Sequence, residues 1–122
     1  MNEEVLNETK QKAKEGDAES QYELAWMYQH GKGIIQDNGE AVKWYTKAAK
    51  QGHGKAQYSL ARIYEGGMYN YEEAVKWYTK AAEQGDIRAQ TSLAWMYDQG
   101  KGVAKDHKEA AKWFRRVANN GA

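Results

Sequence analysis

The chain repeats a ten-residue stretch, and this repetition limits its possible folds more than any other feature. The sequence EAVKWYTKAA occupies residues 40–49 and returns unchanged at residues 73–82, and a related copy, EAAKWFRRVA, occupies residues 109–118. Within each copy, alanines and aromatic residues recur at steps of three and four, which places them on one face of a helix. An amphipathic helix that recurs at a regular interval predicts an array of helical repeats.

Glycines divide the chain into these repeats. They recur at nearly even intervals, the middle one being three residues shorter than the others, at Gly16, Gly52, Gly85 and Gly121. Each interval has room for two helices, of which the second carries the repeated tryptophan. The first helix carries a stripe of Gln, Leu, Ala and Tyr at helical spacing. The stripe comprises Gln21, Leu24, Ala25 and Tyr28, then Gln57, Leu60, Ala61 and Tyr64, then Gln90, Leu93, Ala94 and Tyr97.

The second helix of each repeat has a recognisable start. An Asp or Asn precedes a Glu by three residues, as in a capping box, where the side chains satisfy backbone amides at a helix start. These pairs are Asp37 with Glu40, Asn70 with Glu73, and Asp106 with Glu109. In the loops before them, Ile34 and Val103 are expected to pack onto the helix pair. We expect Met68 or Tyr69 to do so in the shorter middle loop.

Residues 2–15 are predicted to form a further helix, ended by Gly16. This helix has Glu8 and Thr9 where the repeats carry Trp and Tyr, so it is expected to cap the array with a polar outer side. The prediction is an all-α chain of seven helices in one domain, an α-solenoid of antiparallel helix pairs. It divides into a capping helix (1–15), repeat 1 (16–51), repeat 2 with the shortened loop (52–84) and repeat 3 (85–120).

The composition excludes several classes of function. Lys and Arg number 18 and Asp and Glu 17, a net charge of +1, which indicates no basic surface for nucleic acid. The sequence has neither an apolar run of membrane length nor the pattern of a signal peptide. We therefore expect no direct insertion into a membrane, and the compartment stays open between the cytoplasm and, if a signal was removed, the periplasm or exterior. The absence of cysteine excludes disulfides, thiolate zinc sites and a thiol nucleophile.

The order of these residues resembles the Sel1-like repeat, a relative of the tetratricopeptide repeat. The matching pattern runs from the Ala-x-x-Gln-x-x-Leu-Ala-x-x-Tyr of the first helix, through Gly-Lys-Gly, to Glu-Ala-x-Lys-Trp-Tyr-x-x-Ala-Ala. It covers residues 16–121 in three copies. The chain departs from the family pattern where Ile35 and Ala104 stand in place of a frequent loop proline, and in lacking the cysteine pairs of many secreted members. The resemblance implies an α-solenoid, a scaffold or adaptor function and a bacterial origin.

No catalytic or metal-binding constellation is predicted. The Gly-Lys-Gly loops lack the spacing of a phosphate-binding loop, and His30, His53 and His107 share no helix face. We therefore expect no enzyme activity, no metal and no cofactor. Some Sel1-like proteins are associated with bacterial cell-wall chemistry or with β-lactam binding and hydrolysis. The alternative prediction for this chain is therefore a cell-wall-related or β-lactam-binding or -hydrolysing protein. Against it, no serine of the chain has a lysine three residues later.

The resemblance to tetratricopeptide arrays implies a concave groove lined by the first helix of each repeat. Three positions of each first helix are expected to face this groove and to bind a peptide or protein segment. They are Tyr22, Trp26 and Gln29, then Tyr58, Arg62 and Glu65, then Thr91, Trp95 and Asp98. The middle position changes from Trp to Arg to Trp while the Leu-Ala-Tyr stripe stays constant, as expected for separate binding and packing positions. In the alternative interpretation, Trp26 and Trp95 pack between neighbouring first helices.

The last predicted helix suggests a second kind of partner. It carries Trp113 and Phe114 with no further polar helix after it. Either the natural chain is longer, or these residues pack against another copy, so self-association through this helix is a further expectation.

Overall fold

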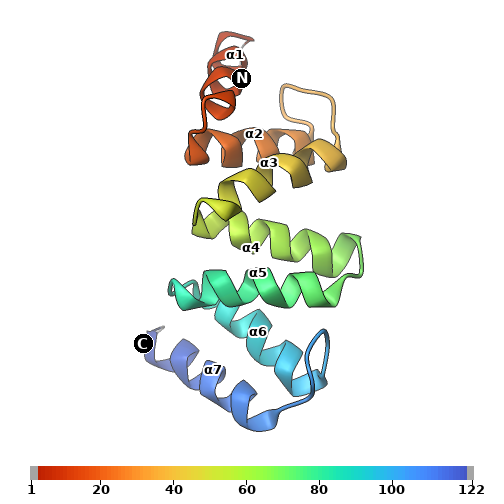
Figure 1. The fold of residues 1–122 in the computed structure, drawn as a ribbon, viewed down its shortest axis with the longest axis vertical. Coiled ribbons are helices and arrows are strands. Elements are labelled where there is room, and N and C mark those ends of the chain that lie inside the picture. Colours follow the sequence, from red (N-terminus) through yellow and green to blue (C-terminus); the bar gives the residue numbers. More distant parts are fainter. Residues whose placement is uncertain (1–2, 121–122) are drawn as a thin grey trace. The chain divides into compact units, whose positions relative to one another are not determined.

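The computed structural model describes residues 3–120, and all regular secondary structure in that range is helical (Figure 1). The expected helix start at Asn2 and the glycine at position 121 lie outside the described residues. The prediction of seven α-helices is confirmed for the described range, with one short π-helical turn, η1, in addition. The elements are α1 (Glu3–Lys14), α2 (Ala18–His30), α3 (Asn38–Lys50), α4 (Gly54–Arg62), η1 (Ile63–Gly67), α5 (Tyr71–Glu83), α6 (Ile87–Gln99) and α7 (His107–Asn120).

The chain forms two compact units. The first ends at Gln57 and the second begins at Tyr58, so the division falls inside α4. In the first unit α1 packs on α2 and α2 packs on α3. In the second unit α5 packs on η1 and on α6, and α6 packs on α7. In both units the core consists of small alanines between large aromatic residues, with Tyr45 and Tyr78 among the largest fully buried side chains.

A buried glutamine links each first helix to the helix before it. The side-chain amide of Gln21 donates a hydrogen bond to the backbone carbonyl of Ala13 in α1, at 3.0 Å. The same bond runs from Gln57 to Ala49 and from Gln90 to Ala82, each at 3.1 Å. These carbonyls belong to the last turn of a helix, and each also accepts the backbone amide of the glycine three residues later, at 3.0–3.1 Å. The glutamine of the sequence stripe therefore stabilises the junction between consecutive helix pairs.

The expected helix starts are confirmed for all three second helices. Asp37, Asn70 and Asp106 accept a hydrogen bond from the backbone amide three residues later, at 3.1, 3.2 and 3.0 Å. The first helices of repeats 1 and 3 use Asp17 and Asp86 in the same way. The first helix of repeat 2 has His53 at this position, where Nδ1 accepts a hydrogen bond from the Ala56 amide at 3.1 Å. The caps supply the acceptor that a helix start requires.

The middle loop differs from the prediction. Either Met68 or Tyr69 was expected to pack onto the helix pair, but both are exposed. The first helix of repeat 2 widens into the π-helical turn, and the chain then closes with a hydrogen bond from the Asn70 amide to the Tyr64 carbonyl at 2.8 Å. The short connection places Tyr69 in the left-handed region, with φ of 52°, a conformation that disfavours side chains other than glycine. The side chain is consequently directed away from the core.

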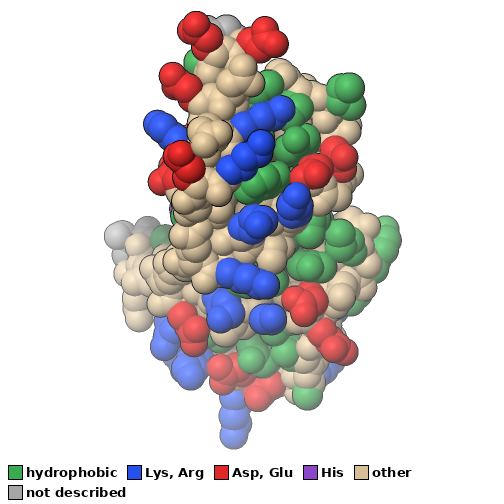
Figure 2. All heavy atoms as spheres, turned by 45° about the horizontal axis from the view of Figure 1, so that its top comes forward, with side chains coloured by type: hydrophobic (Ala, Val, Ile, Leu, Met, Phe, Trp, Pro, Cys, Tyr) green, Lys and Arg blue, Asp and Glu red, His purple; other side chains and the backbone are tan. Residues whose placement is uncertain are grey.

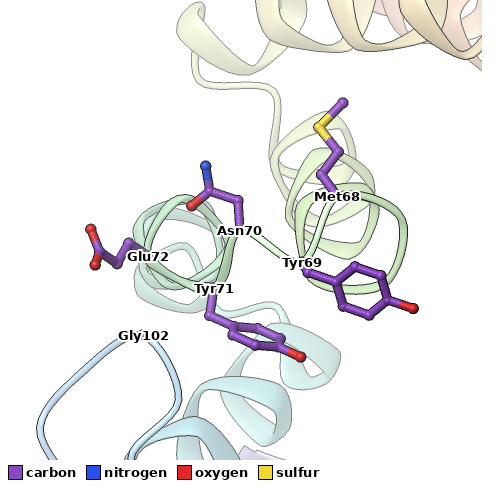
Figure 3. Close-up of a pocket in the computed structure, with 6 residues that line it drawn as sticks. All are labelled: Met68, Tyr69, Asn70, Tyr71, Glu72 and Gly102. Atoms are coloured by element: carbon purple, nitrogen blue, oxygen red, sulfur yellow. The ribbon is translucent and has the colours of Figure 1, made fainter.

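The loop of repeat 3, between α6 and α7 and called the third loop below, lies against the start of α5 (Figure 3). Gly102 has φ of +73°, and a Cβ atom at this position would lie 2.4 Å from the backbone oxygen of Tyr71. Gly102, Tyr71 and the exposed Met68 and Tyr69 surround a recess of about 440 Å³. Glycine is thus needed at position 102 both for its dihedral angle and for the close approach of two backbone segments.

Candidate partner-binding surface

The nine predicted binding residues follow one pattern of exposure in every repeat. The middle members Trp26, Arg62 and Trp95 are exposed, and the flanking members are partly buried. Trp26 retains 40% and Trp95 52% of its accessible surface. By contrast, the three tryptophans of the second helices, at positions 44, 77 and 113, are buried. The tryptophans of the first and second helices therefore have different environments, the second set forming part of the core.

In each repeat the third of the predicted binding residues, which is Gln29, Glu65 or Asp98, is hydrogen-bonded to the second helix of its own repeat. The Tyr45 hydroxyl donates to Gln29, and the Tyr78 hydroxyl donates to Glu65, both at 2.6 Å. The third repeat carries phenylalanine at the matching position, which has no hydroxyl to donate. Its Asp98 is paired instead with His107 Nδ1 at the start of α7, at 2.9 Å. These polar side chains therefore have a structural bond in addition to any contact with a partner.

The first of the three predicted binding residues contacts other aromatic rings in repeats 1 and 2. The ring of Tyr22 lies 5.8 Å from the Tyr45 ring and 4.9 Å from the His53 ring, between centroids. His53 Nδ1 accepts the Ala56 amide, so its Nε2 donates to Glu19, at 2.6 Å. In the second unit Tyr58 lies 5.8 Å from the Tyr78 ring, with the Arg88 guanidinium 4.1 Å above its own ring. The third repeat has Thr91 at this position, and its hydroxyl donates to the Ile87 carbonyl.

The two exposed tryptophans are held by aromatic neighbours. Trp95 packs against Phe114 of α7, with ring centroids 5.3 Å apart and planes at 81°. Trp26 contacts His30 one turn later in α2, at 4.5 Å. Edge-to-face aromatic pairs restrict ring orientation, so Trp95 presents a positioned indole ring to solvent. Packing of Trp26 and Trp95 between neighbouring first helices stays the alternative prediction.

The second unit contains a recess beside Trp95 with a volume of about 270 Å³. Two of the predicted residues, Glu65 and Trp95, line it together. Four further lining residues were not predicted, namely Ser92, Met96, Gln99 and Lys101. Ser92 and Gln99 lie one turn before and one turn after Trp95 on α6, so helical spacing from an exposed tryptophan could have found them.

A hydrogen-bonded chain fixes the carboxylate at the edge of this recess. Tyr78 is almost fully buried, and its hydroxyl donates to Glu65 Oε1 while it also shares a hydrogen bond with Ser92. Burial raises the pKa of Tyr78 far above its usual value, and the hydrogen bond to Glu65 raises it further. The phenol consequently stays protonated and remains a donor over the whole physiological range of pH.

The described residues contain no arrangement typical of an enzyme or a metal site. No group of three or more His, Cys, Asp or Glu side chains in residues 3–120 could hold a metal ion. Two histidine–carboxylate pairs exist in this range, His53 with Glu19 and His107 with Asp98, and neither histidine is hydrogen-bonded to a serine. The face shown in Figure 2 carries both basic and acidic side chains. Among the described helices, none combines the length and apolarity needed to cross a bilayer.

Three helix pairs that share side-chain caps and a buried glutamine define a helical repeat protein of the α-solenoid class. The family model described as Sel1 repeat matches residues 18–53, 54–86 and 87–121. The chain belongs to the Sel1 repeat family. The resemblance noted in the sequence is thereby confirmed. A comparison with curated protein sequences finds no match.

Solved structures agree with this assignment. A protective antigen present in uropathogenic Escherichia coli strains is 41% identical with a TM-score of 0.89, over 96% of this chain and 26% of the antigen. The chain thus spans about a quarter of that protein. A Sel1 repeat protein from Oxalobacter formigenes is 35% identical with a TM-score of 0.86, over 97% of this chain and 91% of that one. Cysteine-rich protein B of Helicobacter pylori, at 24% identity and a TM-score of 0.71 over 97% of this chain and 90% of its own, shares the fold.

The family assignment carries a general function. Sel1 repeats are generally a non-catalytic fold for protein–protein interaction. The self-association expected from Trp113 and Phe114 stays a prediction. In the second unit Trp113 is buried with the Arg116 guanidinium 4.5 Å from its ring, and Phe114 contacts Trp95, so both already have partners within the chain.

Proposed function

We propose that this protein is a non-enzymatic scaffold that binds an extended peptide segment of a partner protein along its first helices. The observation that carries the proposal is the exposure of Trp26 and Trp95 on α2 and α6. By contrast, the tryptophans of α3, α5 and α7 are buried. An exposed indole ring is an apolar surface in water, and Trp, Tyr and Arg are the residue types most enriched at binding hot spots.

The side chains around these tryptophans suit a peptide. Tyr22 and Tyr58 offer partly buried aromatic surface, and Gln29 and Glu65 offer hydrogen-bonding groups whose positions are fixed by Tyr45 and Tyr78. A surface with few freely rotating side chains loses less conformational entropy on binding. We propose that the domain comprises the capping helix and the three repeats with the boundaries given above, and that the first helices supply the contacts.

Replacing Trp26, Arg62 and Trp95 together with alanine tests the proposal. Peptides would first be selected from a random linear library displayed on phage, with the whole chain as the target. Hot-spot residues each contribute about 2 kcal/mol or more, so the triple variant is expected to bind the selected peptides at least about a hundredfold more weakly. Isothermal titration calorimetry would measure the affinity, and circular dichroism would show that folding is unchanged.

A matched control replaces Lys50, Glu83 and Asn119 with alanine. Each lies two residues before the glycine that ends a repeat, and all three are exposed on second helices. This variant is expected to bind the peptides as the native protein does. The proposal fails if no peptide is enriched, or if the two triple variants bind equally well.

A further inference from the structure

We infer that the recess beside Trp95 binds an arginine side chain of the partner peptide, with the indole ring of Trp95 against the guanidinium plane and the Glu65 carboxylate as its counter-ion. The inference rests on the proposed function, because it assigns the residue type that one part of the surface recognises. The recess is formed within the second unit by η1, α6 and the start of the third loop.

The carboxylate of Glu65 is held in place by the protein. Oε1 accepts the hydrogen bond from the buried Tyr78 hydroxyl at 2.6 Å. This bond uses one of the two carboxylate oxygens, and a carboxylate can accept about four hydrogen bonds in all. Oε2 is therefore suited to accept an N–H group of a guanidinium, which forms charge-assisted hydrogen bonds to carboxylates.

The indole ring of Trp95 supplies the second part of the site. The side chain keeps 52% of its surface exposed, and Phe114 fixes its orientation. The tryptophans of the second helices each have a Lys or Arg of the same helix about 5 Å from the ring, as Lys76 does with Trp77 at 5.2 Å. In the described chain no such cation lies over Trp95. A tryptophan face is the most favourable aromatic surface for a cation.

The second unit already recognises one arginine by the same chemistry. The Arg88 guanidinium lies 4.1 Å from the centroid of the Tyr58 ring, and its Nη2 donates to Asp86 Oδ2 at 3.0 Å. An aromatic face and a carboxylate thus hold a guanidinium within this chain. Glu65 and Trp95 present the same pair of groups to the recess, where a partner can reach them.

Two other charged residues near the recess, Lys101 and Asp98, already have contacts within the chain. Lys101 is the basic residue of the lining, and its Nζ lies 5.5 Å from the centroid of the Tyr71 ring on α5. Asp98 is paired with His107. Arg62 is exposed but does not line the recess. Ser92 and Gln99 add polar side chains to the wall, so the carboxylate of Glu65 is the negative charge that a ligand in the recess would meet.

Repeat 1 indicates a substitution that removes the charge of Glu65 and keeps its hydrogen bond. Gln29 stands where Glu65 stands in repeat 2, and it accepts the Tyr45 hydroxyl at the same distance of 2.6 Å. Glu65→Gln therefore copies an arrangement that the chain already uses, keeps the bond to Tyr78 and removes the charge. Glu83→Gln removes an exposed carboxylate of α5 that does not line the recess, and it is the matched control.

The experiment uses peptides from the random-library selection with the full chain. The enriched peptides are expected to share an arginine, and its replacement by glutamine is expected to weaken binding to the native protein about tenfold or more. Glu65→Gln is expected to weaken the arginine peptide by a similar factor and to leave the glutamine peptide unchanged. Glu83→Gln is expected to leave the affinity for the arginine peptide unchanged.

The outcomes separate this inference from the proposed function. If peptides are enriched and depend on Trp26, Arg62 and Trp95, but arginine and glutamine peptides bind equally, the proposed function stands and the arginine site is wrong. Equal weakening of both peptides by Glu65→Gln would also overturn it, because that effect would be structural. If no peptide is enriched, both proposals fail. The replacement in the peptide needs no protein variant, so the test does not depend on the folding of Glu65→Gln.

Discussion

Replacing Trp77 with alanine is expected to lower the free energy of unfolding by about 3–5 kcal/mol. The indole ring is 4% exposed and lies among the fully buried Ala74 and Ala81 of α5. Alanines on either side cannot close the space, since they have no side-chain length with which to reach into it, so the cavity would persist. Lys76 and Lys80, whose ammonium groups lie over the ring at 5.2 and 5.9 Å, would lose that contact as well.

Urea denaturation followed by circular dichroism measures this effect, because the signal from helical backbone does not depend on the missing indole. The matched control is Trp95→Ala in the same unit, which removes an exposed ring and is expected to change the free energy of unfolding by no more than about 1 kcal/mol. Similar losses for both variants would show that the burial of Trp77 does not reflect its contribution to stability.

Gly102→Ala is expected to destabilise the protein by about 3–4 kcal/mol, although it adds a single methyl group. The φ angle of +73° would strain any other residue, and the new Cβ would lie 2.4 Å from the Tyr71 carbonyl oxygen. That neighbour is backbone at the start of α5, and it cannot rotate away as a flexible side chain could. The third loop would have to move from α5, and the recess shown in Figure 3 would change shape.

Gly85→Ala separates the effect of dihedral strain from the effect of the close contact with Tyr71. Gly85 also has a positive φ, +96°, but a Cβ there would meet nothing within 4 Å. Its replacement is expected to cost only the dihedral strain, about 1–2 kcal/mol. The difference between the two variants, measured by urea denaturation under the same conditions, reports the close approach to Tyr71. Equal destabilisation by the two variants would mean that the third loop moves away from Tyr71 at no cost in free energy.

Local signals in the sequence were sufficient for most of the fold. Asp37, Asn70 and Asp106 cap helices because a short polar side chain at a helix start needs only the amide three residues later. The π-helical turn at residues 63–67 could not be predicted in this way. It arises because a loop three residues shorter must still reach the start of α5, and that requirement depends on the positions of both helices.

The candidate site was predictable only in part. The resemblance to tetratricopeptide arrays assigned Trp26, Arg62 and Trp95 to one position of the repeat, and all three are exposed. The hydrogen bond between Glu65 and Tyr78 joins residues on different helices, and the recess depends on how η1 and α6 pack. One clue was present in the sequence, where the third repeat has Phe114 in place of the tyrosine. In the structure the matching acidic residue, Asp98, is paired with His107 instead.

The glutamine bonds mean that no repeat of this chain is complete when taken alone. Each of Gln21, Gln57 and Gln90 requires a carbonyl from the preceding helix pair or, for the first, from α1. Because Ala13, Ala49 and Ala82 occupy matching positions, an internal repeat can be duplicated or deleted as a whole and every glutamine still meets an acceptor. Such arrays can change length by gene duplication without redesign of the junctions, provided that the first helix is kept.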